Sequence, residues 1–184
     1  YAQIDFDGRL ESLTSRAPEF WKFLSDVTKD DENEIDNNMA MFMLSWYGAS
    51  LFGFCPQQKF VIMTGIGRNG KGTLKNALLN ACGEYAIQHD AAVYMRQRFR
   101  ENASGARADL MALRGKRLAF FSEPEGGQFN DELIKAHTGG DKITARPLFS
   151  NRLASWTASH SITFLVNDLP SVDDIGPSMG DRVL

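Results

Sequence analysis

The sequence is short of the residues that build disulfide frameworks and metal centres. Its 184 residues include only two cysteines and three histidines. Cys55 and Cys82 lie far apart with no metal-ligand spacing, so we interpret them as buried free thiols in a reducing compartment. The histidines at positions 89, 137 and 160 also lack ligand spacing. We therefore expect no structural metal built from these side chains.

Long apolar runs and net positive charge are missing as well. No stretch approaches the roughly 20 apolar residues of a membrane span, and none resembles a signal peptide, so we expect a protein of the cytoplasm with no membrane partner. The net charge is −3 and the pI is about 5.6, so any contact with nucleic acid needs a local basic patch. The hydrophobic content of 43% suffices for a core. The chain starts at Tyr1 and stops directly after a strand-and-turn pattern, which suggests a fragment of a longer polypeptide truncated at its C-terminus.

Two regions of the chain differ in pattern. Residues 17 to 54 carry two helical patterns, which predict a helical region over residues 1–55. From residue 56 onward, short apolar runs alternate with helical patterns. The expected strands cover 59 to 65, 116 to 123 and 161 to 168, and the expected helices cover 71 to 81 and 131 to 137. This alternation predicts an α/β core with a mostly parallel sheet over residues 56–184.

A glycine-rich stretch, GIGRNGKGT, follows the first expected strand and precedes a helix. It fits the GxxxxGK pattern, in which backbone amides and a helix N-terminus bind phosphate oxygens and the lysine reaches the β and γ phosphates. The predicted ATP-binding residues are Gly65, Gly67, Asn69, Gly70, Lys71, Gly72 and Thr73. An ordinary glycine-rich turn between a strand and a helix is the alternative.

Hydrolysis of a nucleotide also requires an acid at the end of a second buried strand. The run LAFFSEPEGG ends in Glu123, with Glu125 two residues later. Glu123 is the better candidate for holding Mg²⁺ through a water or for orienting the attacking water. Glu125 follows Pro124 and is more typical of a solvated turn, and a plain surface acid is the alternative for Glu123 itself.

The metal site departs from the usual pattern, in which a serine or threonine hydroxyl after the lysine helps to hold Mg²⁺. Here Gly72 follows Lys71. If a helix begins near Lys71, each residue advances about 100° around the axis, so Thr73 cannot take the place of that hydroxyl without local adjustment. We expect phosphate oxygens, waters and Glu123 to hold Mg²⁺, with Thr73 contributing by adjustment or not at all.

Several motifs in order resemble superfamily 3 helicases, most closely the phage and poxvirus-type primase-helicase family. These motifs are GIGRNGKGTL, GKRLAFFSEPE, KAHTGGDKITARPLFSN, ITFLVNDLP and GDRV, and the similarity runs from about residue 30 to the end. The resemblance implies a P-loop NTPase core of the AAA+ type that hydrolyses ATP and moves along single-stranded DNA as a homo-oligomeric, hexameric ring. No primase site is recognisable, so a primase domain of the parent protein would lie outside this chain.

The resemblance also implies roles for two residues late in the chain. Asn167 matches the polar sensor that contacts the γ-phosphate or the attacking water, a task for an amide that donates and accepts hydrogen bonds. Arg182 matches the arginine finger that stabilises the transition state in the site of the next subunit. The alternatives are a simple turn at Asn167 and a solvated side chain at Arg182.

The segment from 142 to about 156 matches the basic hairpin that this family projects into the ring channel. Lys142, Arg146 and Arg152 are the implied DNA-binding residues, and Trp156 would offer a stacking face unless it belongs to the core. Two other functions stay open: a small-molecule P-loop kinase, and a nucleotide-binding assembly switch with little turnover.

Overall fold

The protein is represented by a computed structural model that describes residues 15–29, 33–53, 57–65, 67–96, 106–122, 128–167 and 179–184. The chain divides into two compact units, residues 1–47 and residues 48–184. Each unit is described by itself. The sequence-based division between residues 55 and 56 remains a prediction.

The described residues of the first unit include two helical elements. Helix α2 spans Pro18–Val27 and has its proline in the first turn, where a missing N–H costs no hydrogen bond. Helix α3 spans Asn37–Ser50 and continues into the second unit. Its start is capped by Asp36, whose Oδ1 accepts from the backbone nitrogens of Asn38 and Met39 at 2.9 and 3.0 Å. Two helices therefore precede the α/β core, as the helical patterns of residues 17 to 54 predicted.

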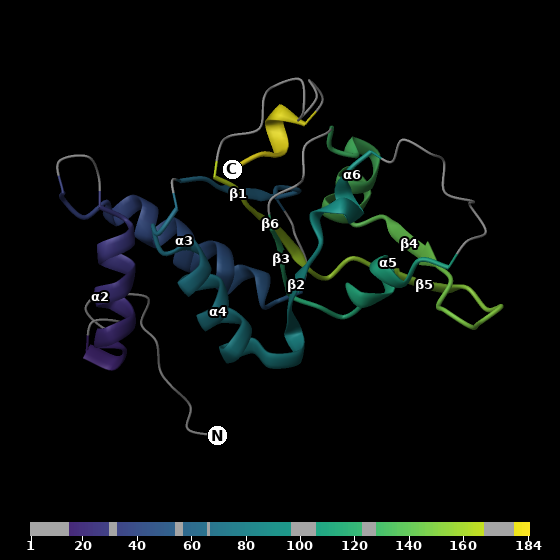
Figure 1. Ribbon diagram of the computed structural model, residues 1–184, viewed down its shortest axis with the longest axis horizontal. Coiled ribbons are helices and arrows are strands. Elements are labelled where there is room, and N and C mark those ends of the chain that lie inside the picture. Colours follow the sequence, from purple (N-terminus) through teal and green to yellow (C-terminus); the bar gives the residue numbers. More distant parts are fainter. Residues whose placement is uncertain are drawn as a thin grey trace. The chain divides into compact units, whose positions relative to one another are not determined.

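The second unit is built on a four-stranded parallel sheet (Figure 1). Its strands are β1 (Val61–Met63), β2 (Ala86–His89), β3 (Leu118–Ser122) and β6 (Ser161–Leu165), in the spatial order β1-β6-β3-β2. A parallel bridge between Phe60 and Val183 adds the end of the chain to the other side of β1. Strand β1 is therefore paired on both sides.

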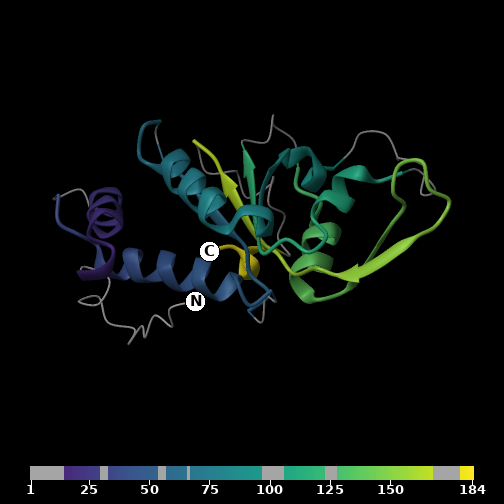
Figure 2. The same cartoon turned by 90° about the horizontal axis from the view of Figure 1, so that it is seen from below.

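Helices and a separate hairpin complete this unit (Figure 2). The helical segments are α4 (Lys71–Cys82), η1 (Gly83–Tyr85), η2 (Ala91–Tyr94), α5 (Ala108–Ala112), α6 (Asp131–Gly139) and η3 (Gly180–Arg182). Strands β4 (Lys142–Ala145) and β5 (Ala154–Thr157) pair antiparallel as a two-stranded sheet of their own. No helix in the described ranges is both long and apolar enough to cross a membrane.

The core lies largely on one face of the parallel sheet. Alternate side chains of three strands, such as Ile62, Phe121 and Phe164, pack with residues of η2, α5, α6 and β4. The intervening residues, such as Phe120, are buried as well, which explains the continuous apolar runs of these strands.

The predicted α/β fold with a mostly parallel sheet is confirmed. Strand β2 was not predicted, because its sequence AIQH mixes apolar and polar residues over a short length. Of the two cysteines that we expected to be buried, Cys82 is only partly buried at the end of α4, and burial raises the pKa of its thiol. Cys55 lies outside the described residues.

Candidate nucleotide and nucleic-acid site

The carboxyl ends of three neighbouring strands lie in one row. Met63 of β1 is paired with Leu165 of β6, which is paired with Ser122 of β3. The pairing continues one residue beyond the strands, because the Val166 nitrogen donates to the Met63 oxygen at 3.0 Å. Asn167 follows directly and is exposed. Asn167 therefore lies beside the segment that follows β1. Both are at the carboxyl ends of the strands, which is the edge where this fold class binds ligands.

That segment is the glycine loop, residues 65 to 70, of which Ile66 lies outside the described residues. Gly65 has a φ of +144°, and a Cβ atom at this position would lie 1.8 Å from Asn69 Nδ2. Gly70 has a φ of 86° and precedes the first residue of α4. A Cβ atom at Gly67 would meet nothing within 4 Å. Only the two ends of the loop thus require glycine for reasons of conformation or space.

Lys71 turns its side chain back into the glycine loop, where Nζ donates a hydrogen bond to the Gly65 carbonyl oxygen. Helix α4 begins at Lys71, and its first internal hydrogen bond joins the Leu74 nitrogen to the Gly70 oxygen at 2.9 Å. The amides of the first turn before Leu74 have no acceptor within the helix, as at any helix start. An ammonium group and a set of backbone donors thus meet at the N-terminus of α4.

The start of α4 at Lys71 fixes the positions of the next two residues. Gly72 and Thr73 are exposed, and a Cβ atom at Gly72 would meet nothing within 4 Å. Thr73 lies two residues, or about 200°, around the helix axis from Lys71. The helix thus begins at the residue that the sequence analysis assumed, and the expected angle between Lys71 and Thr73 about the helix axis applies.

A polar chain runs along the same edge from α4 to β3. Lys75 Nζ donates to Gln88 Oε1 at 2.7 Å, and Gln88 Nε2 donates to Ser122 Oγ at 2.9 Å. The predicted acid Glu123 and its alternative Glu125 come after Ser122 in the sequence, but both lie outside the described residues. Among the described residues, no three or more His, Cys, Asp or Glu side chains are arranged to hold a metal ion.

Arg182 lies at the opposite edge of the sheet. Its carbonyl oxygen accepts from the Phe60 nitrogen at 2.8 Å, beside the amino end of β1, whereas the glycine loop follows the carboxyl end. Its guanidinium donates to Thr138 Oγ1 at 2.8 Å and to Gln58 Oε1 at 3.1 Å. The structure therefore does not bring Arg182 together with Lys71 and Asn167 of the same chain.

The three predicted DNA-binding cations lie on the β4–β5 hairpin. Lys142 is at the base of β4, while Arg146 and Arg152 flank the loop at the other end. Arg146 follows Lys142 by four positions along extended chain, a distance of about 13 Å. Arg146 Nη1 donates to the Ser150 oxygen at 3.1 Å across this loop. The structure thus groups Arg146 with Arg152 and leaves Lys142 apart.

Trp156 lies opposite Ile143 in the hairpin and packs against the core. In the part of the chain that the structure describes, its buried Nε1 has no hydrogen-bond partner. The exposed aromatic ring of the hairpin is instead Phe149, in the loop between the strands. Sequence reasoning did not single out Phe149, although the absence of Asp and Glu from residues 142 to 167 marks this segment as unusual.

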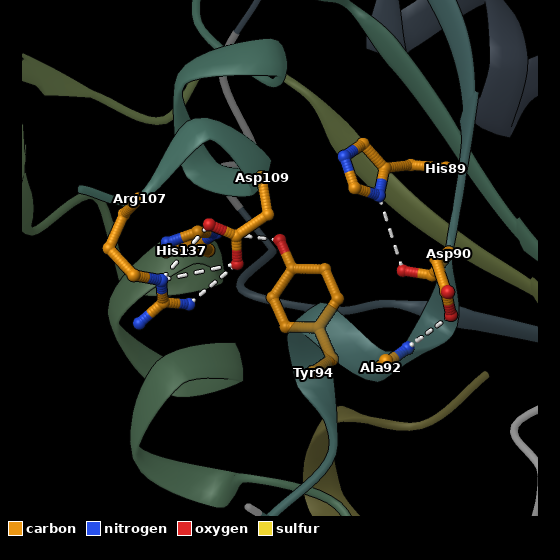
Figure 3. Close-up of polar contacts among 7 residues, drawn as sticks. All are labelled: His89, Asp90, Ala92, Tyr94, Arg107, Asp109 and His137. Atoms are coloured by element: carbon orange, nitrogen blue, oxygen red, sulfur yellow. Dashed lines mark hydrogen bonds and ion pairs between the residues drawn. The ribbon is translucent and has the colours of Figure 1, made fainter. Parts of the chain in front are cut away.

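Three buried side chains, Tyr94, His137 and His160, join the hairpin to the core, and Figure 3 draws two of them, Tyr94 and His137. The Tyr94 hydroxyl lies 2.6 Å from His137 Nδ1 and 3.0 Å from His160 Nε2. Because the hydroxyl has one proton, it donates to one ring and accepts from the other. Each residue comes from a different element: Tyr94 ends η2, His137 lies in the last turn of α6, and His160 sits between β5 and β6.

Burial sets the charge state of this cluster. Desolvation, assisted by the nearby charge of Arg107, lowers the pKa of His137 to about 4. Desolvation, assisted by His137, lowers the pKa of His160 to about 3. Burial also raises the pKa of Tyr94 well above its usual value. All three side chains are therefore neutral at pH 7. Their positions in the sequence are far apart, so no local pattern could have identified the cluster.

An ion pair stands beside the cluster at the start of α5. Arg107 Nη2 lies 2.8 Å from Asp109 Oδ2, and Figure 3 shows the pair next to His137. Burial acts to raise the pKa of Asp109, but the hydrogen bonds from Arg107 and from the backbone, together with the charge of Arg107, outweigh it and the pKa is lowered. The Arg107 nitrogen also donates to the Arg146 oxygen at 3.0 Å. The residue that precedes α5 thus holds the residue that follows β4.

Sequence comparison relates the chain to a viral protein. No protein-family model matches it. A stretch of 144 residues is 30% identical to a protein of Acanthamoeba polyphaga mimivirus named "Putative helicase L207/L206". The match covers 77% of this chain but only 15% of the viral protein. The chain is thus homologous to a small part of that relative.

Comparison with solved structures supports the fold. The C-terminal region of NrS-1 superimposes with a TM-score of 0.59 at 12% identity, over 81% of this chain and 33% of that one. JCV helicase superimposes with a TM-score of 0.55 at 13% identity, over 88% of this chain and 42% of that one. At such identities the likeness concerns the fold alone.

Proposed function

We propose that this chain is part of an ATP-driven DNA helicase of the superfamily 3 type, working in viral or phage DNA replication. The observation that carries the proposal is the geometry around Lys71, whose ammonium lies in the glycine loop between β1 and α4. Asn167 follows the neighbouring strand β6 by two residues and lies beside that loop. The homology to a part of a viral protein named as a putative helicase supports the same function.

The residues around Lys71 fit the phosphates of ATP. The free amides at the start of α4 suit phosphate oxygens, and the helix dipole adds favourable charge. The Lys71 ammonium, now bonded to the Gly65 oxygen, would move onto the β and γ phosphates. Asn167 would orient the attacking water or contact the γ-phosphate.

Mg²⁺ would neutralise charge that develops on the phosphates during hydrolysis. We assign its protein ligand to Glu123, directly or through a water. Thr73 is a marginal ligand at most, because it lies about 200° around the helix from Lys71. Mg²⁺ commonly keeps several waters, so a site with one protein ligand is adequate.

Arg182 would act on a neighbouring copy of the chain. It lies at the amino end of β1, away from the glycine loop of its own chain, so a finger role requires contact in trans. A closed hexameric ring supplies such a contact at every interface. A ring would also let each hairpin reach the same DNA strand, with Lys142, Arg146 and Arg152 at its phosphates. A primase domain on the same parent protein and a location in the host cytoplasm complete the proposal.

An ATPase assay with and without single-stranded DNA tests the proposal. Hydrolysis should rise when DNA is added, and Lys71→Ala should lower turnover about 100-fold or more, the usual effect of removing a charge-stabilising donor. Lys75→Ala is the matched control. This second lysine of α4 bonds to Gln88 instead of the glycine loop, so its loss should leave turnover close to that of the wild type.

The same assay separates the rival functions. ATP binding without appreciable hydrolysis, with or without DNA, would favour an assembly switch. Transfer of the γ-phosphate to a small acceptor, unaffected by DNA, would favour a kinase. Unchanged turnover in Lys71→Ala would reject the glycine loop as the ATP site.

A further inference from the structure

The loop of the β4–β5 hairpin exposes a single aromatic ring almost completely. We call residues 146 to 153 the hairpin tip. In it Phe149 is 104% exposed, and Leu148 and Leu153 are 57% and 69% exposed. A large aromatic side chain gains free energy from burial, and Phe149 together with the two exposed leucines of the same loop forms an apolar surface of the kind that binds a partner.

The hairpin tip holds Phe149 in place from both sides. Its φ of 55° is left-handed, a conformation that non-glycine residues adopt only at a cost. Arg146 Nη1 donates to the Ser150 oxygen at 3.1 Å, and the Arg152 nitrogen donates to Ser150 Oγ at 3.1 Å. Both hydrogen bonds end on the residue that follows Phe149. The ring is therefore presented by an ordered turn.

The charge around Phe149 identifies the class of partner. The whole chain carries a net charge of −3, yet residues 142 to 160 contain no Asp or Glu. Arg146 and Arg152 flank the ring within the hairpin tip. An anionic partner with flat, apolar surfaces matches a ring between two guanidinium groups, and single-stranded nucleic acid has both properties.

The exposed face of the hairpin below the tip supports the same partner. It presents the Lys142 ammonium and the hydroxyls of Thr144, Ser155 and Thr157, all exposed. Hydroxyl and ammonium groups are common contacts of phosphate and sugar. A membrane-inserting tip usually depends on a larger cluster of basic residues than the two arginines found here.

We propose that Phe149 is a stacking residue for an unpaired base of single-stranded DNA, with Arg146 and Arg152 contacting the phosphates on either side. This inference rests on the proposed function and adds to it the residue that touches the bases. We infer single-stranded DNA and not duplex DNA as the partner, because the faces of paired bases in a duplex are already stacked on one another and cannot receive the Phe149 ring. Stacking on one ring tolerates any base sequence.

The test compares two DNA probes that differ only in their bases. The first is a fluorescent oligo-dT and the second is an abasic oligonucleotide of the same length, both measured by anisotropy against the full chain. Phe149→Ala should weaken binding of oligo-dT about 10- to 100-fold, while its binding of the abasic strand stays at the wild-type level. Phe149→Trp should retain tight binding of oligo-dT. Leu148→Ala, which removes a neighbouring exposed apolar side chain, should bind like the wild type.

The outcomes separate this inference from the function on which it rests. If the wild type binds neither probe, both the stacking role of Phe149 and the proposed function are overturned. If the wild type binds DNA, and Arg152→Ala weakens this binding while Phe149→Ala does not, the stacking role is overturned. The assignment of the hairpin as a DNA-binding element then still holds. An equal loss on both probes in Phe149→Ala would also overturn stacking. Loss of self-association or of binding to anionic vesicles in Phe149→Ala, with oligo-dT binding unchanged, would assign the ring to another partner.

Discussion

Single residues of the glycine loop differ in how strictly their positions require glycine. At Gly65 both space and conformation exclude a side chain, because Asn69 occupies the volume that a Cβ atom would need. At Gly67 and Gly72 a Cβ atom would meet nothing within 4 Å. The sequence motif alone gives all these glycines equal weight, whereas the structure ranks them.

Gly65→Ala should therefore be far more damaging than Gly67→Ala. The alanine at position 65 must adopt a positive φ and displace Asn69, at a cost of about 1 to 3 kcal/mol for the backbone alone. We expect Gly65→Ala to lower the free energy of unfolding by at least that amount and to weaken ATP binding. Gly67→Ala is the matched control and should change stability little. Urea unfolding and binding of a fluorescent ATP analogue measure both effects, and equal behaviour of the two variants would contradict the ranking.

Gly72 allows the missing metal ligand to be restored. A serine there fits without a clash and carries its hydroxyl directly after Lys71, where Mg²⁺ usually finds one. Gly72→Ser should lower the Mg²⁺ concentration needed for half-maximal ATPase activity, and Thr73→Ala should raise it only slightly. A Mg²⁺ titration of each variant is the measurement. A large loss in Thr73→Ala would show that Thr73 already serves as the ligand.

At the scale of elements, α6 connects the hairpin with Arg182. His137 in its last turn contacts Tyr94, and the next residue, Thr138, accepts the hydrogen bond from Arg182. Thr138 is only 4% exposed. Gly140, with a φ of 81°, then turns the chain into β4. One turn of helix thus touches the buried cluster, the proposed finger and the base of the hairpin.

The buried cluster should make stability depend on pH. In the folded protein the pKa values of His137 and His160 are about 4 and about 3, below the 6.5 expected for the unfolded chain. As the pH falls below about 6.5, the two histidines bind protons in the unfolded chain but stay neutral in the folded protein. The free energy of unfolding therefore decreases from its value at pH 7. Each histidine should contribute a loss whose slope approaches its limit of about 1.4 kcal/mol per pH unit as the pH falls from about 6 to about 5.

Urea unfolding at intervals from pH 7 to pH 5 measures this loss in a range where ordinary carboxylates stay mostly ionised. His160→Gln should reduce the slope of unfolding free energy against pH, whatever its effect on stability at pH 7. A wild-type slope near zero over this range would show that the two rings accept protons in the folded state, contrary to their burial.

At the scale of the whole molecule, the sequence predicted those features that depend on residues close to one another in the chain. The glycine loop, the start of α4 and three of the parallel strands follow from runs of residues that adjoin in the chain. The contacts of Arg182 with Thr138 and Gln58 do not, because those residues meet only after folding. The same holds for Tyr94 and its two histidines, which no spacing rule connects.

A finger supplied in trans makes activity depend on assembly. Specific ATPase activity should rise with protein concentration, and Arg182→Ala should lower turnover about 10³-fold while ATP binding persists. Mixing Arg182→Ala with Lys71→Ala protein should recover part of the activity, because an intact loop then meets an intact arginine. Activity independent of concentration, with Arg182→Ala fully active, would reject the ring.

The pairing of β1 on both sides also constrains how the protein is made. Val61 pairs with Thr163 and Phe60 with Val183, so the strand that carries the glycine loop receives both its neighbours from segments that are synthesised long after it. Parallel pairs of such high sequence separation form late in folding. During synthesis the glycine loop emerges long before both neighbours of β1 are available, so the ATP binding proposed for this loop would arise only after Val183 has emerged.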